Sequence, residues 1–116
     1  MNRPLIYISA SWSDDYKEMQ KEVRKYSRII YKAGYAPICP ILAQNNYLDS
    51  KNAIERKDAK DMAKELLRRS RVLVVCGDTY NEEVLEDIAL AEKYSIPATS
   101  LNGLMDIIAK RVIHKQ

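Results

Sequence analysis

The chain has 116 residues, of which 47% are hydrophobic and 30% are charged, and its formal net charge is +3. This length allows one domain with a substantial core, and the composition excludes a disordered chain. No apolar run approaches the roughly 20 residues of a membrane-spanning helix. The apolar start at Leu5 turns polar by Ser9, too early for a secretion signal. We therefore expect one domain over residues 1–116.

The first half of the chain predicts a strand, a long helix and a second strand. The apolar run 5–8 is typical of a buried strand. Ser13, followed by two acids, predicts a helix start, and an apolar stripe at spacings of three and four continues until Gly34. Residues 35–39 predict the second strand, which Pro40 ends. The segment 41–50 has no periodicity and is predicted to be a loop.

The second half continues this alternation of helices and strands. Its predicted elements are a helix at 52–69, a strand at 72–76, a helix from Asn81 or Thr79 to Tyr94, a strand at 95–99 and a helix at 104–113. Alternating strands and helices predict a parallel sheet covered on both faces. We expect an α/β, Rossmann-like or flavodoxin-like three-layer sandwich. Its strand order should be 2-1-3-4, because the first and third strands are the most apolar.

The ends of the strands are where a ligand site is expected. In open parallel sheets, ligands bind outside the carboxyl ends of the strands. This rule selects the segments 9–12, 40–47 and 77–81, which contain the candidate substrate-binding residues Ser9, Ala10, Ser11, Trp12, Gln44, Gly77, Asp78 and Asn81. The only tryptophan, Trp12, could pack on a ligand or could simply cover the end of the sheet.

Cysteine, histidine and glycine usage excludes several familiar sites. Cys39 and Cys76 are too few for a disulfide framework, so both should be reduced, which favours a cytoplasmic location. The only histidine, His114, leaves no evident Cys/His pair and no ordinary zinc site. Three scattered glycines exclude a Walker loop and a G-x-G-x-x-G motif. We expect no cofactor, although a carboxylate-bound Mg²⁺ stays open.

Basic residues cluster twice, near residues 68–71 and 110–115, without interleaved exposed aromatics. Such clusters are usually solvated helix faces, which argues against a nucleic-acid partner.

The segment Ile6–Trp12 resembles the opening strand and turn of the nucleoside 2-deoxyribosyltransferases and of their small phage and mobile-element relatives. Residues 34–40, the Gly-Asp turn at 77–78 and the Ile-Pro pair at 96–97 extend this resemblance over nearly the whole chain. It implies that Tyr7 approaches the catalytic acid, that small residues let a nucleobase lie close, and that Gln44 contacts the base. The resemblance also implies a homodimer or a higher homo-oligomer.

The acidic positions of that family are changed here. The family's nucleophilic glutamate, which attacks C1′ of the nucleoside, corresponds to Asp87, one methylene shorter. Two further acidic positions correspond to Arg71 and Asn81. Covalent transfer needs a carboxylate placed to within about half an ångström. The resemblance therefore supports the fold and the pocket more directly than it supports turnover.

Helix geometry discriminates between the acids of the segment 81–94. Its apolar stripe consists of Val84, Leu85, Ile88 and Ala91. At about 100° per residue, Asp87 lies at the flank of this stripe, and Glu86 points nearly opposite. Glu92 projects toward the apolar side, but over a turn further from the pocket. A carboxyl at a buried edge can be functional, which favours Asp87. A role for Glu86, or a purely structural Asp87, stays open.

Three functions compete. The first is an enzyme that cleaves or exchanges the N-glycosidic bond of a nucleoside or nucleotide, with Asp87 and Tyr7 as its catalytic residues. The second is a binding protein without chemistry, such as a nucleotide sensor or a phage-type inhibitor of a host protein. The third is a TIR-type NAD glycohydrolase, because the segment 7–15 also resembles the opening box of that fold. The Trp-Cys pair that precedes the catalytic glutamate of that fold is absent from this sequence.

Overall fold

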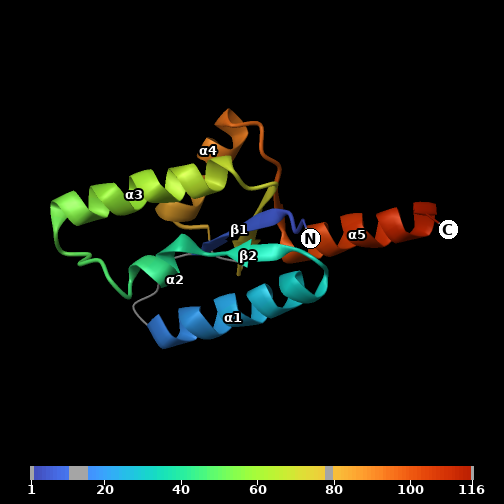
Figure 1. Ribbon diagram of the computed structural model, residues 1–116, viewed down its shortest axis with the longest axis horizontal. Coiled ribbons are helices and arrows are strands. Elements are labelled where there is room, and N and C mark those ends of the chain that lie inside the picture. Colours follow the sequence, from blue (N-terminus) through green and yellow to red (C-terminus); the bar gives the residue numbers. More distant parts are fainter. Residues whose placement is uncertain (1, 11–15, 78–79, 116) are drawn as a thin grey trace.

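The four strands form one parallel sheet in the order β2-β1-β3-β4 (Figure 1). The computed structural model describes residues 2–10, 16–77 and 80–115. The strands are β1 (Leu5–Ala10), β2 (Ala36–Ile38), β3 (Val72–Cys76) and β4 (Ala98–Ser100). The predicted α/β class, parallel pairing and strand order are confirmed.

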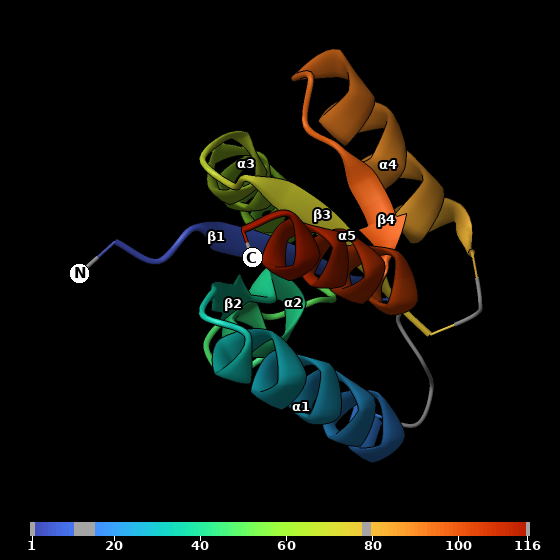
Figure 2. The same ribbon diagram turned by 90° about the vertical axis from the view of Figure 1, so that its right-hand side faces the viewer.

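Helices cover both faces of the sheet (Figures 1 and 2). On one face lie α1 (Tyr16–Lys32) and α5 (Leu101–Lys115), and on the other lie α3 (Ala53–Arg68) and α4 (Glu82–Lys93). The short helix α2 (Pro40–Gln44) follows β2 and packs against α3. This is the predicted three-layer arrangement.

Side-chain alternation along β1 divides the core into two parts. Ile6 and Ile8 point to the face of α1 and α5, whereas Tyr7 packs with Leu73 and Val75 on the face of α3 and α4. All five side chains are at most 3% exposed. Because Tyr7 and Ser9 alternate with the apolar residues, the strand turns both polar side chains to the same helical layer.

Asparagine side chains begin two of the helices. The Asn52 Oδ1 atom accepts hydrogen bonds from the backbone N–H groups of Ile54 and Glu55, and Asn81 Oδ1 accepts from Val84. These bonds satisfy N–H groups that have no partner within the helix. Asn81 is therefore the start of α4, whereas Thr79 and the predicted first-helix start at Ser13 lie outside the described residues.

Three sequence predictions about the elements are wrong. The segment 41–50 is not wholly a loop, because α2 occupies Pro40–Gln44. Proline at the first helical position favours this turn, but five residues are too few to show a helical period. The last strand is Ala98–Ser100 instead of 95–99, and α5 begins at Leu101 instead of 104. Ser95 has a φ of +58°, and the Ile96 N–H still bonds to Ala91 at the end of α4.

Among residues 2–10, 16–77 and 80–115, we find no helix with the length and apolar character required to cross a membrane.

Candidate functional site

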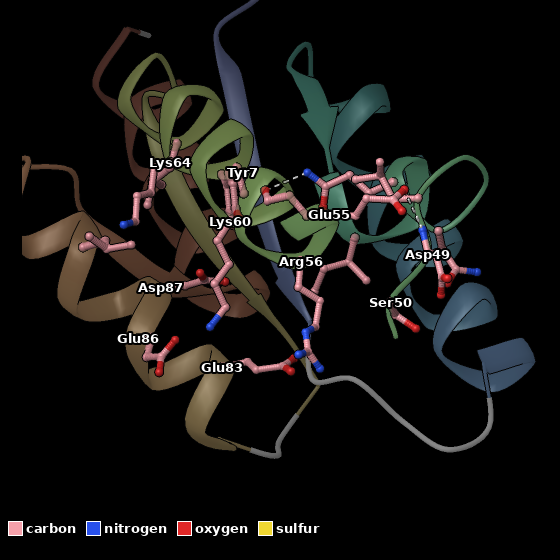
Figure 3. Close-up of a pocket in the computed structure, with 18 residues that line it drawn as sticks. Tyr7, Asp49, Ser50, Glu55, Arg56, Lys60, Lys64, Glu83, Glu86 and Asp87 are labelled. Carbon is pink, nitrogen blue, oxygen red and sulfur yellow. Dashed lines mark hydrogen bonds between the residues drawn. The ribbon is translucent and has the colours of Figure 1, made fainter. Parts of the chain in front are cut away.

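A cavity of about 340 Å³ lies on the α3 and α4 side of the sheet. Figure 3 shows its labelled side chains coming from β1, α3, α4 and the segment after α2. Tyr7, Gln44, Leu67 and Asp87 are among the residues that line it. The volume lies within the range of small-molecule sites, which begins at about 300 Å³.

A contact between β1 and α4 holds the carboxylate of Asp87 in place. The Ser9 hydroxyl donates a hydrogen bond to Asp87 Oδ2 over 2.7 Å, although 78 residues separate the two in sequence. Ser9 is only 1% exposed, whereas Asp87 is half-buried and lines the cavity. One carboxylate oxygen is thus bound by a buried hydroxyl, which leaves Oδ1 for a ligand.

The surroundings of Asp87 keep its proton affinity high. Burial raises its pKa from 3.8 to about 6; the Ser9 hydrogen bond opposes the rise, and the charges of Glu83 and Glu86 add to it. This value is still below 7, so the ionised form prevails at neutral pH. Asp87 is therefore a carboxylate at neutral pH, but one that a nearby positive charge would stabilise.

Burial keeps both Tyr7 and Cys39 protonated at neutral pH. Burial, with a smaller contribution from the charge of Asp87, raises the pKa of Tyr7 far above its ordinary value of 10. Burial raises the pKa of the Cys39 thiol to about 11, and backbone hydrogen bonds of Leu42 and Ile41 oppose part of this rise. Tyr7 thus keeps its proton and can donate a hydrogen bond to a group in the cavity.

The structure brings part of the predicted site together. Tyr7, Gln44 and Asp87 line the cavity, and the buried Ser9 hydroxyl donates a hydrogen bond to Asp87. The Gln44 amide also donates to the carbonyl oxygen of Ala59 over 2.9 Å, which ties α2 to α3.

Other predicted site residues lie elsewhere. Ala10 is buried in the core on the α1 and α5 face. The Gly77 N–H donates to the Tyr26 hydroxyl on α1, and the Asn81 side chain caps α4. These three are outside the lining of the cavity, and their role in binding stays a prediction. Ser11, Trp12 and Asp78 lie outside the described residues.

The exposed face of α4 differs from the helical projection. Leu85, expected in the apolar stripe, is 53% exposed, because α4 meets the sheet through Val84, Ile88 and Ala91. Leu85 stands roughly 90° from the centre of that group. Glu86 is exposed, yet it lines the mouth of the cavity beside Asp87.

Sequence reasoning missed the cationic wall of the cavity. Arg56, Lys60 and Lys64 on α3 all line it, opposite Glu83 and Asp87 on α4 (Figure 3). Their spacing of four residues, which places them on one side of a helix, was the available signal. Within the described part of the chain, no cluster of three or more histidine, cysteine or acidic residues could hold a metal ion.

A cavity on an α/β sheet, with one restrained carboxylate and a facing cationic wall, is typical of a protein that binds a small polar molecule. Among solved structures, the fold is similar to that of a 2-deoxyribosyltransferase from the psychrotolerant bacterium Bacillus psychrosaccharolyticus. The TM-score is 0.69 at 15% identity, and the match covers 83% of this chain and 70% of that chain. This likeness shows a shared fold. Residues 4–101 match the family described as "Domain of unknown function (DUF7768)", and the chain belongs to that family. No curated protein matches the chain.

Proposed function

We propose that the protein binds a nucleoside or nucleotide in the cavity between α3 and α4 and acts on its N-glycosidic bond. The observation that carries this proposal is the Asp87 carboxylate, which faces the cavity with Oδ2 held by Ser9. The fold it shares with a 2-deoxyribosyltransferase supports the same class of ligand. The whole chain, 1–116, would act as one domain.

The proposed reaction uses the free oxygen of Asp87. A bond forms between Oδ1 and C1′ of the sugar while the bond from C1′ to the base nitrogen breaks. The electron pair stays on that nitrogen, which takes a proton from water. Water or a second base then attacks C1′ and releases the carboxylate. The Ser9 hydrogen bond limits rotation of the carboxylate, and Tyr7 donates a hydrogen bond to the sugar or to Asp87.

Release of free base tests the proposal. The purified chain is incubated with 2′-deoxynucleosides, their 5′-monophosphates and NAD, and free base is measured by chromatography. Asp87→Asn should abolish release and retain ligand binding, because it removes charge and nucleophilicity but keeps shape. Asp87→Glu should retain or raise activity, because it restores the longer side chain of the glutamate that the nucleoside 2-deoxyribosyltransferases use. Glu92→Gln is the matched control, since Glu92 is an exposed acid of α4 outside the cavity lining, and an equal loss of activity in it would contradict the assignment of Asp87.

A binding protein without chemistry is the second candidate. The observation that favours it concerns Arg71 and Asn81. They stand at two positions that are acidic in the nucleoside 2-deoxyribosyltransferases, and both are outside the cavity lining. Melting-temperature shifts with a nucleotide, in the absence of free base from every variant, would support this candidate over the enzyme. Under this second candidate, the protein could instead act as an inhibitor that binds a host protein.

The free cysteines and the family resemblance also lead to proposals on cellular location and assembly. Cys39 and Cys76 are both free, which supports the reducing cytoplasm as location. The homo-oligomer implied by the family resemblance stays a prediction, and analytical ultracentrifugation would test it.

A further inference from the structure

Three cations of α3 share the side of the helix that faces the cavity. Arg56, Lys60 and Lys64 follow one another at intervals of four residues and span about 12 Å along the helix axis. Ala59, Ala63 and Leu67 lie on the same side, and the two alanines leave space beside the longer side chains. In Figure 3, Arg56 and Lys60 reach from α3 toward the acids of α4.

This arrangement places three like charges on one side of α3, with no acid of the same helix between them on that side. Like charges four residues apart on a helix repel each other. By the helical period, Asp58 and Glu65 of the same helix lie on its opposite side, and Asp61 lies at the flank. Within the described residues, none of the three cavity-lining cations takes part in an ion pair, whereas Arg68 and Arg69 pair with Glu65.

The opposite wall carries the complementary chemistry. Glu83, Glu86 and Asp87 line the α4 side, so the cavity has a cationic wall facing an acidic one. The remaining lining acids have local hydrogen bonds: Asp49 accepts from the Lys51 N–H, and Glu55 accepts from the Asp49 N–H. A ligand that spans this cavity should have an anionic group at one end and a hydroxyl-rich or electron-deficient centre at the other.

We infer that the protein takes a 5′-phosphorylated nucleoside in preference to the free nucleoside, with its phosphate bound by Lys60, Arg56 and Lys64. The inference rests on the proposed function, because Asp87 is taken to face C1′. The 5′ carbon is attached on the other side of the ring oxygen from C1′. A sugar with C1′ at α4 can therefore direct its phosphate toward α3. The three side chains bind phosphate oxygens through charge-assisted hydrogen bonds.

The test compares the four 2′-deoxynucleosides with their 5′-monophosphates in the full chain. The ratio of kcat/KM for nucleotide over nucleoside should exceed one and should fall as salt screens the cations. Lys60→Met, which keeps the aliphatic stem, should lower this ratio by about 10-fold to 100-fold, the loss of a charged hydrogen bond. Lys57→Met is the matched control, since Lys57 is on α3 outside the cavity lining.

Binding by the Asp87→Asn variant separates the two proposals. If the monophosphate raises its melting temperature and Lys60→Met removes that effect, the phosphate site stands even where no base is released. If bases are released from nucleosides with no preference for phosphate, the inference is wrong and the proposed function stands. Inorganic phosphate is included as a competitor. If it protects as strongly as the monophosphate, the site recognises the free anion and the nucleotide inference is overturned.

Discussion

Replacing Asp87 with asparagine should stabilise the folded chain at neutral pH. In the folded state, burial raises the pKa of Asp87 from 3.8 to about 6, so ionising it costs more than in the unfolded chain. Asparagine carries no charge, fills the same volume and can still accept the Ser9 hydrogen bond. The variant therefore removes the cost of the buried charge and keeps the contact.

The magnitude follows from the pKa rise. A difference of about two units corresponds to about 3 kcal/mol at about 1.4 kcal/mol per unit. Asp87 is only half-buried, so solvent screening lowers the expected gain to roughly 1–2 kcal/mol. For a domain of 116 residues, each kcal/mol corresponds to about 4 °C in melting temperature.

The gain should depend on pH in a defined way. Below pH 3.8, Asp87 is protonated in both states and contributes no penalty. Between pH 3.8 and about 6, the unfolded chain loses the proton first, so stability is lost as the pH rises. Above pH 6 the penalty is complete. Urea unfolding of wild type and Asp87→Asn at pH 4 and pH 7.5 should show a clear gain only at the higher pH.

Glu92→Gln provides the control, because it removes an exposed charge from the same helix. It should change stability by less than about 0.5 kcal/mol at both pH values. An equal gain for Asp87→Asn at both pH values, or no gain at pH 7.5, would refute the reasoning from a buried carboxylate.

Three further changes test single contacts. Asn81→Ala should lower the free energy of unfolding by about 1 kcal/mol, whereas Asn81→Asp should keep the helix cap. If Asn81→Asp binds the ligand more weakly, Asn81 contacts the ligand directly. Gly103→Ala should lower the melting temperature despite better helix propensity, because its Cβ would meet Thr99 Oγ1, and adding Thr99→Ala should restore it. Tyr26→Phe should speed amide hydrogen exchange at Gly77, whose N–H loses its acceptor; unchanged exchange would contradict that bond.

The fold was predictable because the sequence carries it in long, consistent patterns. The run 72–76 is apolar at every position and is buried at the centre of the sheet, and Gly34 takes the positive φ expected after a helix. The α2 helix could not be predicted in the same way. Its five residues depend on Pro40 and on packing against α3, and neither gives a periodic signal.

The site was predictable only in part. Periodicity shows which side of a helix or strand a residue occupies, but it does not show which other element packs against that side. The family resemblance implied that Tyr7 approaches the acid at position 87, and both side chains line the cavity. The helical projection of α4 turned Glu86 away, yet α3 packs so that Glu86 lines the cavity mouth. The sequence also does not show that the α3 cations line the cavity, because this depends on how α3 packs against α4.

The position of Asp87 is itself an argument for function. If the Asp87 side chain only had to bond Ser9, the raised pKa predicts that asparagine would do so with a gain in stability. Cations are available across the cavity, yet in the described part of the chain neither Lys60 nor Arg56 forms an ion pair with it. The cations and acids face each other from opposite walls of a cavity of about 340 Å³. This cavity leaves room for a ligand between them. This arrangement supports the proposed ligand site at Asp87.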